Sequence, residues 1–349
     1  KNPNYWEKDP LHPENQLPYV DKIKYIILEE TAKIAGLRTG KIDLNLWGLA
    51  ARHKESLVKS NPEIEVVGML DKAMMLTARI TMKPFSDKRV RKAVMLAINH
   101  QEMKDQLYQG DAVYPTFPVH AGFTPYHISL EEMYRDRPDI ARLFEYHPEE
   151  AKQLLAEAGY PNGFKTNIIT SEIMTEGVEA ASLYLSLVGI EAQVRNVEVA
   201  KMYSMTMTKE PDPTYTGLGS SDTGCQVAFP TCAFQIHMDP RGPMTWFGNG
   251  NTEFENSELG QTFIKMFDDL NATMDPDEHL RKWKKLTYWA YDELWFMPMV
   301  MKMGHNYHQP WVHGFDGVHG LMDKWLYHLK GTWLDLDQRQ KKSGRGPND

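Results

Sequence analysis

The sequence predicts a two-lobed α/β protein, and three observations lead to this prediction. The chain has 349 residues, which is too long for one ordinary hydrophobic core. A strand–helix–strand pattern occurs twice, once near the amino terminus and once after residue 147. Residues 208–256 lack regular periodicity, and so long an irregular stretch inside a compact domain is usually functional or covers a site.

The first strand–helix–strand pattern covers residues 21–47. In KIKYIILEE, apolar residues alternate and then run together, as expected for a half-buried strand. TAKIAGLRTG places small and apolar residues at helical spacing and ends on Gly40, a residue type that commonly terminates helices. KIDLNLW then predicts a second strand.

The second pattern begins with HPEEAKQLLAEAGYPNGF. His147 is the expected N-cap, Pro148 takes the first helical position, and the two glutamates that follow complement the positive helix end. Gly159 ends the helix, and a Pro-Asn-Gly turn follows. KTNIITS predicts a strand, residues 176–189 a helix and IEAQVRNVEV another strand, which completes the β-α-β order.

Other segments add helices and one strand. Helices are expected over 87–110, 257–271 and 276–294. FMPMVMK predicts a buried strand. Arg89 and Arg91 are candidates for binding a carboxylate, but they lie on the polar side of the first of these helices, where solvated positions or structural ion pairs are expected instead. The tail from Asp335 is polar and is predicted to be frayed.

Composition excludes several functional classes. A net charge of −8 disfavours a nucleic-acid-binding surface, and 42% hydrophobic residues argue against wholesale disorder. No apolar run approaches the roughly 20 residues that span a bilayer. The first residues are polar and proline-rich, with no initiator Met and no signal-peptide pattern, so we expect a processed product or a fragment.

The sequence offers no catalytic or metal-binding motif. H-E-x-x-H, G-x-S-x-G and the P-loop pattern are all missing, so we expect no catalytic residues and no cofactor. His305 and His308 are three residues apart, like many pairs that bind no metal, and no metal site is predicted. Cys225 and Cys232 can close a small disulfide loop in an oxidising compartment, or remain as two free thiols.

Several short stretches, taken in order, resemble one known family. They are NPNYW at Asn2–Trp6, G-K-I-D at Gly40–Asp43, FSDKRVRKA at Phe85–Ala93, EEAKQLLAEAGYPNGF at Glu149–Phe164, and NSEL at Asn256–Leu259 followed by PMVMKMGHNY and WVHGF. AINH stands where that family often has AIDR. The chain resembles the family 5 extracellular solute-binding proteins, which are the oligopeptide, dipeptide and nickel binders of ABC importers.

The resemblance implies a fold and a domain organisation. It implies a type II periplasmic-binding-protein-like fold of the large oligopeptide-binding class, with mixed sheets and flanking helices. Residues 1–84 are expected to form the carboxyl-terminal half of the first lobe and residues 85–310 the second lobe. Residues 311–349 are expected to return to the first lobe, and the family's amino-terminal part is expected to precede Lys1.

The resemblance also implies ligand-binding residues. LGSSD at 218–222 stands where peptide-binding members have an Asp that binds the peptide's α-ammonium group, so Asp222 is the candidate anchor, with Gly219, Ser220 and Ser221 beside it. Gly219 replaces the family's Trp, which leaves a wider pocket or a turn-capping role for Asp222 as alternatives. Trp47, Gly48, Trp246 and Phe247 are the further candidates.

The expected function is therefore capture of a small solute, with a peptide as the first choice, for delivery to the permease subunits of an ABC transporter. An oligosaccharide, an opine or a metal chelate is the alternative ligand. A hydrolase and a sensor or chaperone are competing functions. We expect a monomer in the periplasm or outside the cell. It is expected to be membrane-associated as a lipoprotein, with a signal or lipid anchor that lies outside the given chain.

Overall fold

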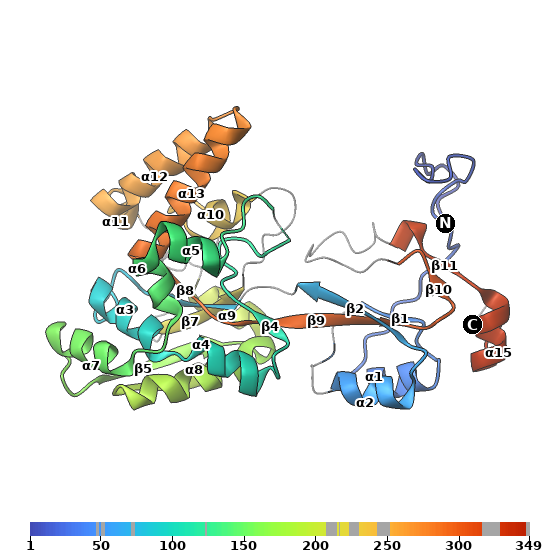
Figure 1. Ribbon diagram of the computed structural model, residues 1–349, viewed down its shortest axis with the longest axis horizontal. Helices are drawn as coiled ribbons and strands as arrows, with labels where there is room; N and C mark the ends of the chain where they lie inside the picture. Colours follow the sequence, from blue (N-terminus) through green and yellow to red (C-terminus); the bar gives the residue numbers. More distant parts are fainter. Residues whose placement is uncertain are drawn as a thin grey trace. The chain divides into compact units, whose positions relative to one another are not determined.

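The structure is a computed structural model that describes residues 1–46, 49, 53–70, 74–122, 124–206, 215, 217–222, 230–242, 252–315 and 329–346. The chain divides into two compact units (Figure 1). Unit 1 combines Lys1–Asp71 with Met303–Asp349, and unit 2 is Lys72–Lys302. In the described residues, no helix has the length and apolar character needed to cross a bilayer.

The chain crosses between the units twice, after Asp71 and after Lys302. The sequence analysis predicted these boundaries between residues 84 and 85 and between residues 310 and 311. The first difference arises because β3 (Met74–Ala78) pairs with two strands of the unit 2 sheet. The second arises because β9 (Met301–His308) starts in unit 2 and continues into the sheet of unit 1. That these two units correspond to the two predicted lobes remains a prediction.

Unit 1 has small sheets with helices. Its elements are α1 (Glu30–Arg38), β1 (Leu44–Asn45), α2 (Lys54–Ser60), β2 (Glu65–Leu70), β10 (Val312–His313), the 3-10 helix η5 (Leu329–Gly331), β11 (Trp333–Leu334) and α15 (Leu336–Ser343). β9 lies antiparallel between β1 and β2, and β10 pairs with β11. One apolar cluster contains Leu37 of α1, Leu57 of α2 and Tyr307 of β9, and a second contains Trp311 and Leu329.

Two strand predictions in unit 1 need correction. Residues 22–28 of KIKYIILEE form no regular element, and no described strand pairs with them. Ile27 is 100% exposed and Ile26 is 52% exposed, so the apolar pattern is present without the neighbour that a strand requires. KIDLNLW keeps strand pairing only at Leu44–Asn45.

The polar tail is helical rather than frayed, which also corrects the prediction. α15 begins after Asp335, whose side chain accepts a hydrogen bond from the backbone N–H of Gln338. It ends at Gly344, which has a φ of 72° and so adopts the left-handed conformation that suits glycine. Arg339 is the buried residue of this helix.

Unit 2 contains the larger sheet and most helices. Its elements before the sheet's first parallel strand are α3 (Lys88–Ala97), α4 (His100–Glu102), the π-helical turn η2 (Met103–Leu107), β4 (Ala112–Val113), α5 (Leu130–Asp136), α6 (Pro138–Ala141), the 3-10 helix η3 (Arg142–Phe144) and α7 (Pro148–Glu157). The expected helix over 87–110 is therefore interrupted near Ile98, whereas the helix after Pro148 is confirmed. His147 takes the N-cap position, but its side chain makes no capping bond.

The remaining elements of unit 2 include the sheet strands. They are β5 (Phe164–Thr170), the 3-10 helix η4 (Glu172–Met174), α8 (Thr175–Leu187), β6 (Ile190–Asn196), α9 (Val199–Thr206), β7 (Leu218–Asp222), α10 (Cys232–His237), α11 (Thr252–Glu255), α12 (Glu258–Asn271), α13 (Pro276–Glu293) and β8 (Phe296–Pro298). The predicted helices over 176–189, 257–271 and 276–294 are confirmed. The described residues of the stretch 208–256 include β7 and two short helices, α10 and α11, which the sequence analysis did not predict.

Two arginines of FSDKRVRKA close the ends of two helices. Arg91 is 3% exposed, and its guanidinium donates to the carbonyl oxygens of Glu293, the last residue of α13, and Phe85. Arg89 forms an ion pair with Asp87 and donates to the carbonyl oxygen of Glu157, the last residue of α7. Arg91 therefore satisfies the Glu293 carbonyl, which the end of α13 leaves unpaired, and does not lie in solvent, which was one of the predicted alternatives.

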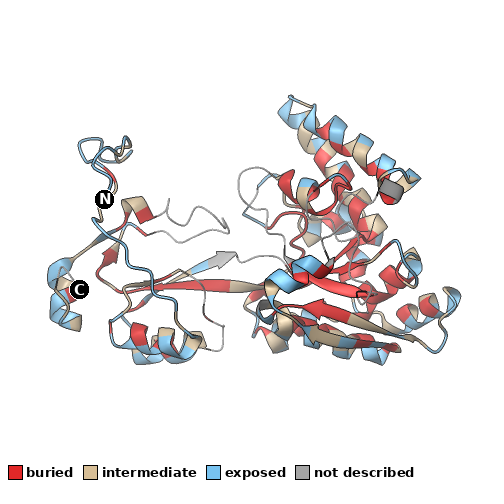
Figure 2. Cartoon of the chain, turned by 180° about the vertical axis from the view of Figure 1, so that it is seen from behind, coloured by how far each residue is buried: buried red, intermediate tan, exposed pale blue. Residues whose placement is uncertain are grey.

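Many residues of unit 2 are buried (Figure 2). Aromatic side chains dominate the core between its last helices: Trp283 of α13 is fully buried, and its ring lies 4.8 Å from that of Phe234 in α10. The indole N–H of Trp283 donates to the carbonyl oxygen of Tyr126, and the Tyr291 hydroxyl donates to that of Phe117. The polar edge of each ring thus has a partner, as buried Trp and Tyr require.

A close approach of two glycines joins the turn after α7 to the turn before β6. Gly163 has a φ of 73°, and a Cβ built on it would lie 1.8 Å from the carbonyl oxygen of Gly189. No larger residue fits at this contact. The Pro-Asn-Gly turn of the motif therefore sets the register of the parallel pair, in which Phe164 lies opposite Ile190.

Candidate functional site

Three parallel strands end at one edge of the unit 2 sheet, whose order is β6-β5-β7-β3-β8. β5 is parallel to both β6 and β7. From β5 the chain passes through α8 to β6 on one side, and then through α9 to β7 on the other side of β5. In open α/β sheets, ligands bind outside the carboxyl ends of strands where the connections diverge in this way. The ends of β5 and β7 are therefore the candidate site.

Buried hydroxyl groups connect the strands next to this edge. Ser220 of β7 donates from its hydroxyl to the hydroxyl of Thr170, the last residue of β5, at 2.8 Å. Thr77 of β3 donates to the carbonyl oxygen of Gly219 at 3.1 Å. Ser220, Thr170 and Thr77 are all fully buried, and these bonds compensate for the loss of water. Gly219 and Ser220 are thus held within the sheet.

Asp222 is the last residue of β7, so the structure places the backbone of the predicted anchor at the candidate edge. It lies opposite Met74, the first residue of β3, and Ser221 lies opposite Met75. Ser221 is 3% exposed. The side chain of Asp222 is outside what the structure describes, and its role as an anchor stays a prediction.

The other predicted ligand-binding residues cannot be compared with this edge. Trp47, Gly48, Trp246 and Phe247 lie outside the described residues. Of the predicted ligand-binding residues, the structure therefore describes together only the four at positions 219–222 of β7. Thr170 is the residue at this edge that the sequence analysis did not single out. The sequence pattern that could have indicated Thr170 is a predicted strand that ends shortly before a predicted helix.

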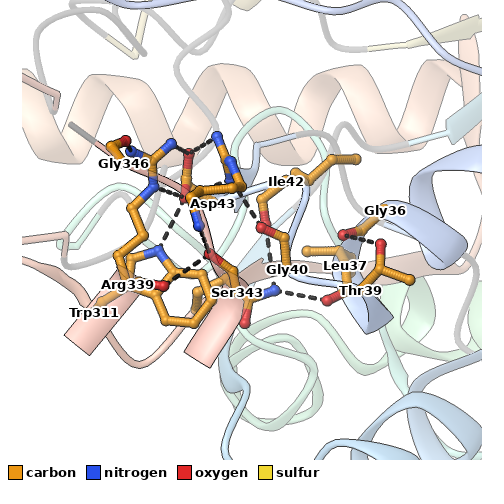
Figure 3. A network of polar contacts seen from close by, with 12 residues as sticks. Gly36, Leu37, Thr39, Gly40, Ile42, Asp43, Trp311, Arg339, Ser343 and Gly346 are labelled. Atoms are coloured by element: carbon orange, nitrogen blue, oxygen red, sulfur yellow. Dashed lines mark hydrogen bonds and ion pairs between the residues drawn. The ribbon is translucent and has the colours of Figure 1, made fainter. Parts of the chain in front are cut away.

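The Asp of G-K-I-D has a structural role in unit 1 (Figure 3). The Asp43 carboxylate accepts hydrogen bonds from the indole N–H of Trp311 at 2.9 Å and from the guanidinium groups of Arg339 and Arg345. Arg345 also donates to the carbonyl oxygen of Gly40. We call this group the Asp43 clamp. It fastens the carboxyl-terminal residues to the segment after α1. The Asp43 side chain is 25% exposed, and two oppositely charged partners compensate for its partial burial.

The two histidines of β9 do not face each other. His305 and His308 lie three positions apart on a strand, so their side chains point to opposite faces. His305 lies 3.4 Å from the Lys54 ammonium nitrogen, and His308 lies 3.6 Å from a Glu65 carboxylate oxygen. Among the described residues, no group of three or more His, Cys, Asp or Glu side chains could hold a metal ion.

Cys232 is the first residue of α10 and is disulfide-bonded. Cys225, its predicted partner, lies outside the described residues, so this pairing stays a prediction. Tyr215 precedes β7, at the opposite end of the strand from Asp222, and contacts Arg79. Burial raises the pKa of the Tyr215 hydroxyl well above its ordinary value. That hydroxyl therefore stays protonated at neutral pH and is not available as a base.

Comparison with known proteins identifies the family. The model of the bacterial extracellular solute-binding proteins, family 5 (middle region), matches residues 1–228. The chain belongs to this family. Its members are solute-binding proteins of ABC transporters rather than enzymes, in agreement with the sequence prediction.

Curated relatives carry the name glutathione-binding protein GsiB. The protein from Escherichia coli is 26% identical over 311 residues, which cover 86% of this chain and 56% of the relative. The protein from Salmonella choleraesuis is 25% identical over 329 residues, which cover 89% of this chain and 57% of the relative. The chain thus spans about half the length of the curated relatives it matches.

Solved structures show the same fold. The periplasmic binding protein DppA from Helicobacter pylori, in complex with the peptide STSA, matches with a TM-score of 0.71 at 22% identity, over 88% of this chain and 56% of that one. AgaA from A. tumefacien, in complex with agropinic acid, matches with a TM-score of 0.72 at 19% identity, over 91% and 62%. The predicted fold, that of type II periplasmic binding proteins, is confirmed.

Proposed function

We propose that the protein captures a peptide or a similar small solute and delivers it to the permease of an ABC importer. Family membership supports the general role. The single structural observation that carries the proposal is the position of Asp222, at the end of β7 beside the strand β5, where the connections diverge. Because the relatives are nearly twice as long as their matched part, the activity of the whole protein belongs to the proposal.

The choice of a peptide rests on the carboxylate at this strand end. A free α-ammonium group gives Asp222 a charge-assisted hydrogen bond, which is about twice as strong as a neutral one. The curated relatives are named for glutathione, and one solved neighbour is bound to a peptide. Both of these ligands carry a free amine. An amine anchor therefore suits the residue that this sequence supplies.

Isothermal titration calorimetry with tri-alanine and N-acetyl-tri-alanine tests the proposal. We expect the acetylated peptide to bind about 10–100-fold more weakly, because a hydrogen bond to a charged group contributes roughly 1.5–3 kcal/mol. Asp222→Asn should weaken binding of the free peptide to the level of the acetylated one. Reduced glutathione, which also carries a free α-amine, is the second probe.

Equal affinity for the free and acetylated peptides would rule out the amine anchor. If neither peptide nor glutathione binds, while agropinic acid or Ni(L-His)₂ does, the peptide assignment is wrong. These two probes are chosen because solved neighbours contain them. Ser204→Ala in the exposed last turn of α9 serves as the control substitution, for which no change is expected.

We also propose that the protein works as a monomer outside the cytoplasm, in the periplasm or at the cell surface, where a lipid anchor can hold it. The disulfide bond of Cys232 supports this location, because disulfides persist in oxidising compartments. Treatment of intact cells with a membrane-impermeant biotin reagent tests the location. Labelling that requires disruption of the cytoplasmic membrane would contradict it.

A further inference from the structure

The chain crosses between the units after Asp71 and after Lys302. The two segments of unit 2 that adjoin these crossings are hydrogen-bonded to each other. The backbone N–H of Met299, shortly before the second crossing, donates to the carbonyl oxygen of Met74, shortly after the first crossing, at 2.9 Å. β4 pairs with Met301 and Lys302, the last residues before the second crossing. Backbone bonds therefore hold the place from which the chain enters unit 1.

One buried side chain reaches the same place. His100 follows the break after α3 and is fully buried. Its Nε2 lies 3.1 Å from the carbonyl oxygen of Pro298, the last residue of β8, and its Nδ1 lies 3.1 Å from that of Ile98. The rings of Tyr114, which follows β4, and Phe144 pack against the imidazole with centroids 5.7 and 5.4 Å away.

The neutral imidazole has one N–H for these two carbonyl groups. Burial lowers the pKa of His100 to about 4, so the ring is neutral at neutral pH. Ile98 lies two residues away in the chain, and a bond to it holds only the local turn. Pro298 lies 198 positions away, so a bond to it joins α4 to the strand that leads to the second crossing.

We infer that His100 is a positioning residue for the hinge between the two units, with Nε2–H donating to the carbonyl oxygen of Pro298. The imidazole holds residues 298–302 against α4 and β4 and thereby fixes where the second crossing starts. The consequence for solute capture rests on the proposed function, because hinge closure around a ligand matters only if the protein binds one. His100 itself acts through Pro298 and not through the solute.

The tautomer of His100 in the unmodified protein provides the first test. Long-range ¹H–¹⁵N correlation spectra at pH 7 distinguish a protonated Nε2 from a protonated Nδ1, and the signals missing in the His100→Gln variant assign the ring. We expect Nε2 to carry the proton. A ring protonated at Nδ1 cannot donate to Pro298, and this result overturns the inference.

Two matched variants provide the second test. The amide nitrogen of Gln reaches the position of Nε2, whereas that of Asn reaches only the position of Nδ1. Both remove the ring, so thermal unfolding should show similar losses of stability. Spin labels on exposed Ala35 of α1 and Ala156 of α7, attached through unnatural amino acids, report the distribution of distances between the units.

We expect the distance distribution of His100→Gln to match that of the unsubstituted protein and the distribution of His100→Asn to be broader or shifted. Coinciding distributions for all three proteins would show a merely structural role and contradict the inference. The measurement uses no ligand, so failure of the proposed function, seen by calorimetry, remains distinguishable from failure of this inference.

Discussion

Arg91 and Arg89 are two residues apart, yet the structure gives them very different surroundings. Arg91 is buried and bonds only carbonyl oxygens, whereas Arg89 is half exposed and pairs with Asp87. Burial lowers the pKa of Arg91 to about 10, so it remains charged at neutral pH. Because a buried charge needs its partners and buried carbonyls need their donors, the two residues should differ in their contribution to stability.

Arg91→Met should lower the free energy of unfolding of unit 2 by about 2–4 kcal/mol, since it leaves the carbonyl groups of Glu293 and Phe85 without their donor. Arg89→Met is the matched control and should cost about 1 kcal/mol or less, as expected for an exposed ion pair. Urea unfolding followed by tryptophan fluorescence measures both values. Equal losses would contradict the assignment.

His100 provides a prediction for the dependence of stability on pH. Its folded-state pKa of about 4 lies below the ordinary value of 6.5, so the folded protein favours the neutral ring. The stabilisation from the neutral ring is therefore complete above pH 6.5 and is lost as the pH falls toward 4. The loss amounts to at most about 3 kcal/mol over this window.

The His100→Gln variant tests this prediction because glutamine does not titrate. Its free energy of unfolding should depend less steeply on pH between 4 and 6.5 than that of the unsubstituted protein. Chemical denaturation at a series of pH values gives both curves. Parallel curves over this window would show that His100 is not the group responsible.

At the scale of elements, α15 shows how a polar segment becomes ordered. Its one buried residue, Arg339, reaches the Asp43 clamp and also donates to the carbonyl oxygen of Gly346. The helix therefore attaches to unit 1 through charge and hydrogen bonds more than through apolar burial. Such an attachment depends on a few contacts, so a single substitution should release it.

Arg339→Met should speed hydrogen exchange in the peptides that contain β1 and α15, because the Asp43 carboxylate loses one of its two guanidinium partners. We expect a local loss of about 1–3 kcal/mol. Lys341→Met, on the exposed face of the same helix, is the control and should stay within about 0.5 kcal/mol. Unchanged exchange in Arg339→Met would contradict the clamp.

Local patterns were sufficient for the elements that carry their own apolar periodicity. The helices α7, α12 and α13 and the parallel strands β5 and β6 were all predicted from such patterns. Residues 22–28 were wrongly predicted as a strand, because strand pairing depends on a partner outside the segment. α15 was missed because the partner of Arg339 lies 296 positions away.

The candidate site was harder to predict for the same reason. LGSSD has no strand pattern, since its polar groups are paired with Thr170 and Thr77 on other strands. The divergence of connections beside β5 results from the order of strands in the sheet, which no local pattern contains. The resemblance pointed to Asp222. The fold places its backbone at the end of β7, and its binding role stays a prediction.

The whole molecule consists of two units with unequal cores. In the described residues, unit 2 has one large continuous apolar cluster that includes Trp283, Tyr291 and Phe263. Unit 1 has two small and separate clusters, around Leu37 and around Trp311. Since stability grows with the apolar area buried, the two units should differ in their resistance to denaturant.

Unit 1 should therefore unfold first as urea is increased. Hydrogen exchange measured at a series of urea concentrations should show that peptides from β2 lose protection before peptides from β5 and β6. These strands have similar lengths, so the comparison is matched. Loss of protection at one common concentration would indicate a single cooperative transition and contradict this expectation.

The helix-end bonds of Arg89 and Arg91 have a consequence for how relatives of this protein are found. Both residues belong to a stretch that resembles the family. Both hydrogen-bond the last residues of α7 and α13, which lie far from β7 along the chain. A database search that relies on this stretch therefore selects for a scaffold and not for a solute. Naming the cargo of such a protein requires the sequence of the strand ends, and the two kinds of information should be weighted separately when function is transferred between genomes.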